Sequence, residues 1–298
     1  MNTEIKPSRA KIWILAARPK TLWAAVSPVL IGTAMAFEGG KGAWLPAAAA
    51  LFGAVMIQIG TNFANDYFDY QKGADAGPRL GPLRVTQAGL VRPGAMRAAF
   101  FLAFFLAALA GTYLTWHAGW PIAIIAILSI VSGVLYTAGP YPLGYVGLGD
   151  VFVLIFFGPV AVGGTYYVQA LEISPAVLVA GLAPGLFSVA ILTVNNLRDI
   201  SGDTRAGKKT LAVRFGRRFS RIEYLVCVIA GSAVPAVLWW MDQGRMFSLA
   251  TLGVPLLAIP SFAKVLRSTD GPVLNGVLAA TGKLLLVYSV VFSVGWMA

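Results

Sequence analysis

Nine long apolar stretches, almost free of charged side chains, constrain the fold of this chain more than any other feature of its sequence. They lie near 21–37, 44–64, 95–116, 119–137, 151–170, 175–194, 222–241, 247–263 and 277–297. An α-helix needs about 20 such residues to cross the hydrocarbon core of a bilayer. Since 58% of the 298 residues are hydrophobic and only 12% are charged, a soluble globular fold is excluded. We predict an all-α, polytopic membrane protein with about nine transmembrane helices.

The basic residues lie mostly on one side of these stretches. Of the 23 Lys and Arg residues, all but Lys41 and Arg245 precede the first stretch or lie near the second, sixth and eighth connections. Because positive residues accumulate in cytoplasmic loops, we expect a cytoplasmic amino terminus and an external carboxyl terminus. The expected location is the bacterial cytoplasmic (inner) membrane. Orientation therefore accounts for the net charge of +11, and no nucleic-acid partner is expected.

The twelve acidic residues are more informative than the apolar ones, because several of them gather at two places. Asp66, Asp69 and Asp75 follow the second stretch, and Asp199 and Asp203 follow the sixth. Side chains three or four residues apart share one face of a helix, so each close pair would point in one direction. Carboxylates with no His or Cys nearby favour Mg²⁺, which commonly shares its coordination with substrate phosphates. Solvated loop carboxylates are the alternative interpretation.

The two acidic segments occupy equivalent places in the chain. Four predicted spans separate them, and an even number of spans returns the chain to the same side of the membrane. We therefore predict one transmembrane domain over 1–298, with two pseudo-repeated four-helix halves (about 21–137 and 151–263) around a central cavity. The last helix, 277–297, would pack outside these halves. A polar mouth above an apolar interior suits a substrate with a diphosphate head and a long hydrocarbon tail.

These motifs resemble those of the UbiA-type intramembrane prenyltransferases. Asn65-Asp66-x-x-Asp69 is similar to the first Asp-rich motif of that family, and Asp199-x-x-x-Asp203 is similar to the second. Within the family, the chain resembles the branch that prenylates 1,4-dihydroxy-2-naphthoate. That likeness is carried by Gly73-Ala74-Asp75, Gly81-Pro82-Leu83-Arg84, Gln87, Gly89, the run from Tyr136 to Gly144 and the run from Gly164 to Gln169. Gly207-Lys208-Lys209-Thr210-Leu211, which follows Asp203, belongs to the likeness of the second Asp-rich motif. The third acid of the general motif is displaced: Gly73 stands at its place, and Asp75 follows.

The resemblance implies a set of site residues. Mg²⁺, with Mn²⁺ able to substitute, would be held by Asn65, Asp66, Asp69, Asp199, Asp203 and Asp75. The residues expected to be catalytic are Asp66, Asp69, Asp199, Asp203 and Tyr136. The residues expected to bind diphosphate are Lys208, Arg84, Arg198 and Lys72. The residues expected to bind the aromatic acceptor are Arg18, Asn62, Tyr141, Tyr166 and Gln169.

The resemblance also implies a reaction. Metal and cationic side chains would stabilise the departing pyrophosphate of an allylic polyprenyl diphosphate, leaving an allylic carbocation. Aromatic faces would stabilise this cation, and the candidates are Tyr67, Phe68, Tyr136, Tyr141, Tyr166 and Tyr167. The naphthoate ring would attack the cation and lose CO₂, giving demethylmenaquinol.

Other functions stay open at this point. The acceptor could instead be 4-hydroxybenzoate or homogentisate, and the donor could carry a phytyl chain. A cation-coupled transporter would also place acids in a helical bundle, although it predicts them near mid-membrane. A lipid-headgroup phosphotransferase would use Mg²⁺ and Asp residues too, but its signature motif is absent from the sequence.

Overall fold

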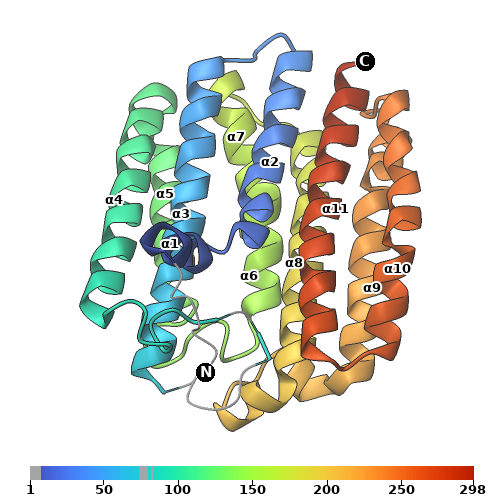
Figure 1. Ribbon diagram of the computed structural model, residues 1–298. Coiled ribbons are helices and arrows are strands. Elements are labelled where there is room, and N and C mark those ends of the chain that lie inside the picture. Colours follow the sequence, from blue (N-terminus) through green and yellow to red (C-terminus); the bar gives the residue numbers. More distant parts are fainter. Residues whose placement is uncertain (1–7, 74–79, 82) are drawn as a thin grey trace.

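The protein is a bundle of long helices, shown in Figure 1. The computed structural model describes residues 8–73, 80–81 and 83–298, and every regular element within them is helical. The elements are α1 (Arg9–Ala17), α2 (Pro19–Glu38), α3 (Trp44–Gln71), α4 (Pro93–Ala118), α5 (Trp120–Leu135), α6 (Gly149–Ile155), the π-helical turn η1 (Phe156–Val160), α7 (Ala161–Ala170), α8 (Pro175–Arg205), α9 (Leu211–Trp240), the 3₁₀-helical segment η2 (Met246–Gly253), α10 (Val254–Arg267) and α11 (Gly271–Met297).

The all-helical membrane fold predicted from the sequence is confirmed. Eight helical segments in the described part of the chain are long and apolar enough to cross a bilayer. The remaining predicted span, 119–137, corresponds to α5, which is apolar but shorter, at 16 residues. Two of the eight segments are composite, since α6, η1 and α7 form one and η2 with α10 forms another.

The two helices that carry the acidic motifs continue well beyond their apolar parts. We predicted spans ending at residues 64 and 194, but α3 extends to Gln71 and α8 to Arg205. Each helix ends just before a glycine in the left-handed region, Gly73 (φ 63°) or Gly207 (φ 71°). A glycine adopts this conformation at little cost and so terminates a helix. Both acidic motifs therefore lie on rigid helices rather than on loops. We call the end of the bundle where α3 and α8 terminate the motif end.

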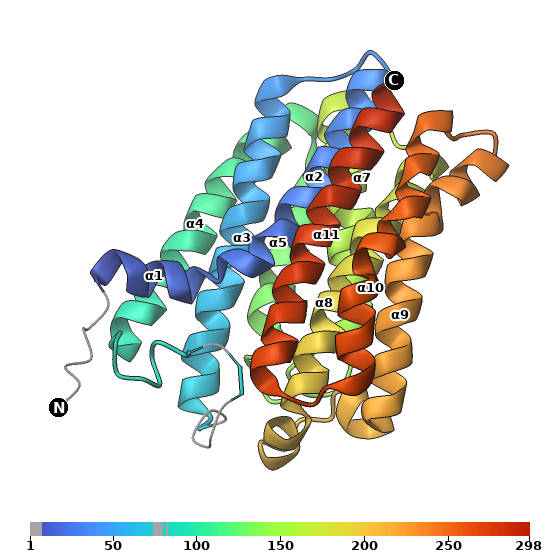
Figure 2. The same cartoon turned by 45° about the vertical axis from the view of Figure 1, so that its right-hand side comes forward.

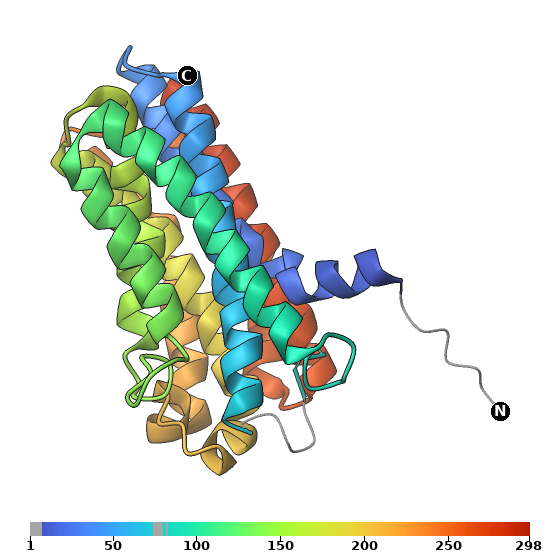
Figure 3. The same cartoon turned by 90° about the vertical axis from the view of Figure 1, so that its left-hand side faces the viewer.

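The helices are arranged around α8 and α2. In Figure 1, α3, α4 and α5 lie on one side, α8 to α11 on the other, and α2 with α6 and α7 between them. The last helix, α11, contacts α2, α8 and α10 and buries Tyr288 and Phe292 completely. The short helix α1 leaves the bundle at a steep angle, as Figures 2 and 3 show. Arg18, in the left-handed region at φ 52°, makes this bend.

The composite span packs closely against α8 where its helix is irregular. Gly158 has non-helical backbone angles, and Pro159 follows it within η1. A β-carbon on Gly185 would lie 2.5 Å from the carbonyl oxygen of Leu154, and one on Gly181 would lie 2.7 Å from the Pro159 α-carbon. These small residues allow η1, which carries part of the cavity wall, to approach α8.

Substituting Gly185→Ala is expected to destabilise the protein by about 1–3 kcal/mol, because the added methyl group meets backbone atoms that cannot rotate away. The measurement is thermal unfolding of the purified protein in detergent. The matched control is Gly276→Ala in α11, where a β-carbon meets no atom within 4 Å. Equal melting temperatures for the two variants would contradict the close packing described here.

Candidate active site

A cavity of about 990 Å³ runs through the bundle, and its wall changes character along its length. At the motif end it is lined by charged and amide side chains: Asn65, Asp69, Arg84, Asp199, Asp203 and Lys208. Deeper in the bundle it is lined by apolar and aromatic side chains of α5, α6, η1 and α8. A polar mouth and an apolar interior are thus present together.

The first motif presents Asn65 and Asp69 to the cavity from the last two turns of α3. Asn65 accepts a hydrogen bond from the Thr137 hydroxyl at 2.8 Å. Asp69 is nearly fully buried and accepts one from the Arg84 guanidinium at 2.8 Å and another from the Tyr145 hydroxyl at 2.9 Å. Asn65 and Asp69 lie four residues apart, so one helical face carries both.

Asp66 has a different position from the one expected of a metal ligand. Its carboxylate does not line the cavity; it accepts the backbone N–H groups of Val85 at 3.2 Å and Thr86 at 3.3 Å. Asp66 therefore fixes the segment that carries Arg84, and we no longer assign it to the metal or to the catalytic set. Asp75 lies outside the described residues.

The second motif lies across the cavity on α8. Asp199 and Asp203 both line the cavity, again one helical turn apart. Asp199 pairs with the Arg198 guanidinium at 2.5 Å, and Asp203 pairs with the Lys208 amine at 3.4 Å. Arg198 itself is buried and also donates to Asn195 and Asn275. Because its nitrogens already bind these protein acceptors and it does not line the cavity, we no longer assign Arg198 to diphosphate binding.

Tyr145 is a residue of the site that the sequence did not reveal. Its hydroxyl donates to Asp69, and the amines of Lys72 and Lys208 each lie 4.8 Å from the centre of its ring. Burial, followed by the charge of Asp69, raises the pKa of Tyr145, so its hydroxyl stays a donor. Burial lowers the pKa of Lys72, whose amine donates to the Thr137 carbonyl at 2.6 Å. Lys72 thus holds the 136–147 loop instead of lining the cavity.

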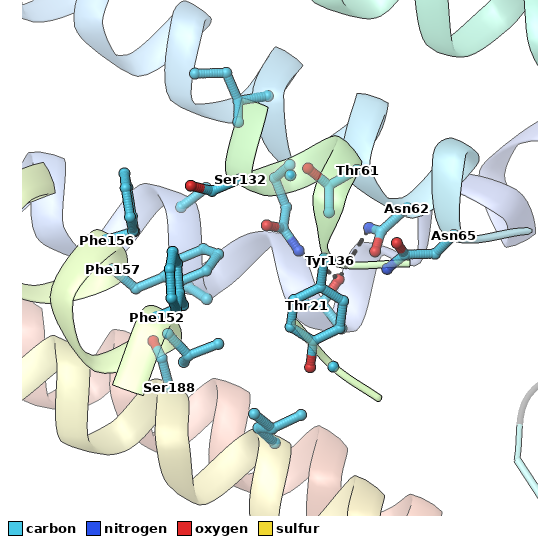
Figure 4. Close-up of a pocket in the computed structure, with 18 of the residues that line it drawn as sticks. Thr21, Thr61, Asn62, Asn65, Ser132, Tyr136, Phe152, Phe156, Phe157 and Ser188 are labelled. Atoms are coloured by element: carbon cyan, nitrogen blue, oxygen red, sulfur yellow. Dashed lines mark hydrogen bonds between the residues drawn. The ribbon is translucent and has the colours of Figure 1, made fainter. Parts of the chain in front are cut away.

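Residues expected to bind the acceptor are divided between two places. Arg18 and Asn62 line the cavity, and the Asn62 amide donates to the Ala17 carbonyl at 2.9 Å and the Thr21 hydroxyl at 3.2 Å. Gln58, which sequence reasoning missed, lines the same wall one turn away and donates to Thr21 at 3.4 Å. Figure 4 shows Thr21 and Asn62 on this wall.

Three other expected acceptor residues lie elsewhere. Tyr141 is 81% exposed on the loop after α5 and does not line the cavity. Tyr166 and Gln169 belong to α7 near the opposite end of the bundle, where Gln169 accepts from the Ala43 backbone N–H at 3.2 Å. Their spacing in the sequence could not reveal this, because α7 turns these side chains towards α2 and the connection before α3. We therefore remove all three from the acceptor site.

An aromatic wall faces the polar one. Phe152, Phe156 and Phe157 come from α6 and η1 and line the cavity, as Figure 4 shows. The rings of Phe152 and Phe156 stack with their centres 5.9 Å apart. Tyr136 lines the cavity near its polar end. Of the aromatic residues expected from the sequence, Tyr136 lines the cavity, whereas Tyr67 and Phe68 pack with Phe100 of α4.

The chemistry of the ligand set fits a hard divalent cation. Carboxylate and amide oxygen atoms are available at the motif end of the cavity from Asn65 and Asp69 of α3 and from Asp199 and Asp203 of α8. Neither His nor Cys is among the described residues that line it. Carboxylate and amide oxygens without soft ligands are typical of Mg²⁺ sites that also bind substrate phosphates.

Comparisons with known proteins identify the family of this chain. The sequence profile of the UbiA prenyltransferase family matches residues 25–277. The 1,4-dihydroxy-2-naphthoate octaprenyltransferase of Escherichia coli (strain K12) is 38% identical over 98% of this chain and 97% of that protein. The protein of the same name from Mycobacterium tuberculosis is 39% identical over 93% of this chain and 94% of that protein.

Solved structures show the same fold at low sequence identity. A UbiA homolog from Aeropyrum pernix K1 superposes with a TM-score of 0.66 at 16% identity, covering 97% of this chain and 98% of that one. A UbiA homolog from Archaeoglobus fulgidus bound to GPP and Mg²⁺ superposes with a TM-score of 0.65 at 13% identity, covering 95% of this chain and 99% of that one. Because the family profile spans most of the chain and curated relatives match nearly its full length, this protein belongs to the UbiA prenyltransferase family.

Proposed function

We propose that this protein transfers a polyprenyl group from a polyprenyl diphosphate to 1,4-dihydroxy-2-naphthoate, releasing CO₂ and pyrophosphate and giving demethylmenaquinol. The observation that carries the proposal is the pair of acidic helical faces, Asn65/Asp69 and Asp199/Asp203, which line the polar end of one cavity with an apolar interior. The naphthoate octaprenyltransferases at 36–39% identity supply the choice of acceptor.

The polar end of the cavity is suited to bind and activate the diphosphate. Mg²⁺ bound there would neutralise the developing negative charge on the leaving pyrophosphate. Asn65, Asp69, Asp199 and Asp203 would hold the metal. Lys208 and Arg84 line the same end and carry the positive charge that phosphate oxygens require. That Mn²⁺ can substitute for Mg²⁺ is part of the proposal.

The interior of the cavity is suited to the carbocation and the acceptor. When the carbon–oxygen bond of the donor breaks, the electron pair leaves with pyrophosphate and an allylic cation remains. The faces of Tyr136, Phe152 and Phe156 can stabilise that cation and exclude water. On the opposite wall, Arg18 would bind the acceptor carboxylate, and Asn62 with Gln58 would orient its hydroxyl groups. A carbon–carbon bond forms at the ring position from which CO₂ departs.

The chain is a multi-pass membrane protein, and its finer placement is also proposed. The basic residues Lys72, Arg84, Arg205, Lys208 and Lys209 all lie at the motif end. By the bias of positive charge towards the cytoplasm, we place this end on the cytoplasmic side of a bacterial inner membrane, with the carboxyl terminus outside. The two pseudo-repeated halves, 21–137 and 151–263, remain a proposal about its architecture.

Membranes containing this protein are expected to form a prenylated naphthoquinol when supplied with dihydroxynaphthoate, a labelled polyprenyl diphosphate and Mg²⁺. The acceptor panel should include 4-hydroxybenzoate and homogentisate, and phytyl diphosphate should be tested as an alternative donor. Product formation is measured by chromatography of the labelled lipid. Membranes lacking the protein are the control. Preference for a benzenoid acceptor would overturn the naphthoate assignment while leaving prenyl transfer intact.

A further inference from the structure

The segment that carries Arg84 is attached to the bundle at two separate places. We call Leu80, Gly81 and residues 83–91 the motif loop. One attachment is to α3, where Asp66 accepts the backbone N–H groups of Val85 and Thr86. The other is to α11, more than 180 residues later in the chain, where Asn275 donates to the Leu80 carbonyl at 2.9 Å. Arg84 lies between the two attachments.

Asn275 joins the motif loop to the second acidic motif. Its amide nitrogen binds the Leu80 carbonyl, and its amide oxygen accepts from the Arg198 guanidinium at 2.6 Å. Arg198 in turn donates to Asp199, which lines the cavity. A single side chain therefore connects three segments that are distant in the sequence. Figures 1 and 2 show α11 packed beside α8, which brings these groups together.

The backbone around this connection is closely packed. A β-carbon on Gly81 would lie 2.7 Å from an Arg198 guanidinium nitrogen, and one on Gly271 would lie 2.8 Å from the Leu80 β-carbon. The loop thus contacts both α8 and the first turn of α11 directly. Two sides of the loop are fixed by packing and hydrogen bonds, so the position of Arg84 opposite Asp69 depends on α11 as well as on α3.

The connection needs the particular chemistry of an amide. The Leu80 carbonyl can only accept a hydrogen bond, whereas the Arg198 guanidinium can only donate one. Asn supplies a donor to the first and an acceptor to the second in one short side chain. Aspartate has nearly the same shape and would still bind Arg198, but its ionised carboxylate cannot donate to Leu80. This difference allows the two halves of the connection to be tested separately.

We propose that Asn275 is a positioning residue for the donor site: it holds the motif loop so that Arg84 faces Asp69 and the diphosphate. The inference rests on the proposed function for its effect on catalysis, but its effect on the loop is independent of which substrates are used. Asn275 does not line the cavity, so it acts through Arg84 and Arg198 rather than on the substrate.

The test compares Asn275→Asp and Asn275→Ala with the unmodified protein in nanodiscs. Hydrogen–deuterium exchange of a peptide covering residues 83–92 is expected to be about tenfold faster in both variants, which corresponds to about 1.4 kcal/mol. The KM for polyprenyl diphosphate is expected to rise by a similar factor, while kcat changes less than threefold. Asn275→Gln, which keeps both hydrogen-bonding functions, should recover part of the KM.

The matched control is Thr281→Val on the same helix. This change removes the buried hydrogen bond between Thr281 and Tyr224 without touching the cavity or the motif loop. It is expected to lower the melting temperature but to leave loop exchange and KM unchanged. If Asn275→Asp leaves both the loop exchange and the KM unchanged, the positioning role is wrong. If loop exchange rises but no naphthoate is prenylated by any variant, the proposed function fails and the loop attachment stands.

Discussion

Asp69→Asn is expected to reduce kcat for prenyl transfer by at least about 10²–10³-fold. The Asp69 carboxylate lines the cavity and accepts hydrogen bonds from both Arg84 and Tyr145. An amide of the same size removes one negative charge from the proposed metal site and leaves Arg84 without this partner. The measurement is the initial rate with labelled polyprenyl diphosphate and dihydroxynaphthoate, together with the melting temperature of each variant.

The control for this substitution is Asp242→Asn. Asp242 is exposed in the connection after α9 and has a φ of 54°, a conformation that Asn tolerates well. The chemical change is identical, but it is far from the motif end, so activity and stability should stay at the unmodified level. A folded Asp69→Asn protein with more than a tenth of the normal kcat would contradict the role given to Asp69.

Asp199→Asn is expected to lower activity by a similar factor and also to raise the Mg²⁺ concentration needed for half-maximal rate by at least about tenfold. The physical reason is that a charged oxygen ligand on α8 is replaced by a neutral one, and Mg²⁺ depends on carboxylates to offset its loss of hydration water. The unmodified enzyme should lose its activity when divalent cations are chelated and regain it when Mg²⁺ is returned. Rates are measured over a series of free Mg²⁺ concentrations.

Another arginine–carboxylate pair, far from the motif end, offers the matched control. Glu38 pairs with Arg245 near the opposite end of the bundle, and Arg245 also lies over the ring of Trp296. Glu38→Gln likewise removes the charged partner of an arginine, so it reports the structural cost of such a change. It should leave the Mg²⁺ dependence unaltered. An unchanged Mg²⁺ requirement in Asp199→Asn would separate this residue from the metal site and restrict it to holding Arg198.

The polar end of the site shows what local sequence information can predict. Asp69, Asp199 and Asp203 are rare charges at the ends of apolar helices, where an unpaired carboxylate is costly, so their positions alone indicated a function. Asp66 is the same type of residue as Asp69 and lies in the same motif, yet its carboxylate binds the motif loop. Nothing in the sequence distinguishes it from Asp69, because the difference depends on which backbone N–H groups pack against each face of α3.

Residues contributed by distant segments were the ones that sequence reasoning missed or misplaced. Tyr145 and Gln58 belong to no charge pattern, and Asn275 is one of several polar residues in a long, mostly apolar helix. Their roles depend on the contacts of the 136–147 loop with α3 and of α11 with α8. Tyr141 and Tyr166 look equally suitable in the sequence, but the first faces outward and the second lies near the other end of the bundle.

The membrane fold, the helical segments and the two acidic motifs could all be predicted from the sequence alone. The length of an apolar stretch and the positions of charged residues are local properties, and they decide whether a segment is more stable in lipid or in water. Three features of the site become visible only in the folded protein: which oxygen atoms share the cavity, which cations are already paired with protein acceptors, and which aromatic rings face the interior. Those outcomes depend on the rotation of each helix about its axis and on loop contacts between residues as far apart as Leu80 and Asn275. Packing fixes both of them, and no short stretch of sequence contains that information.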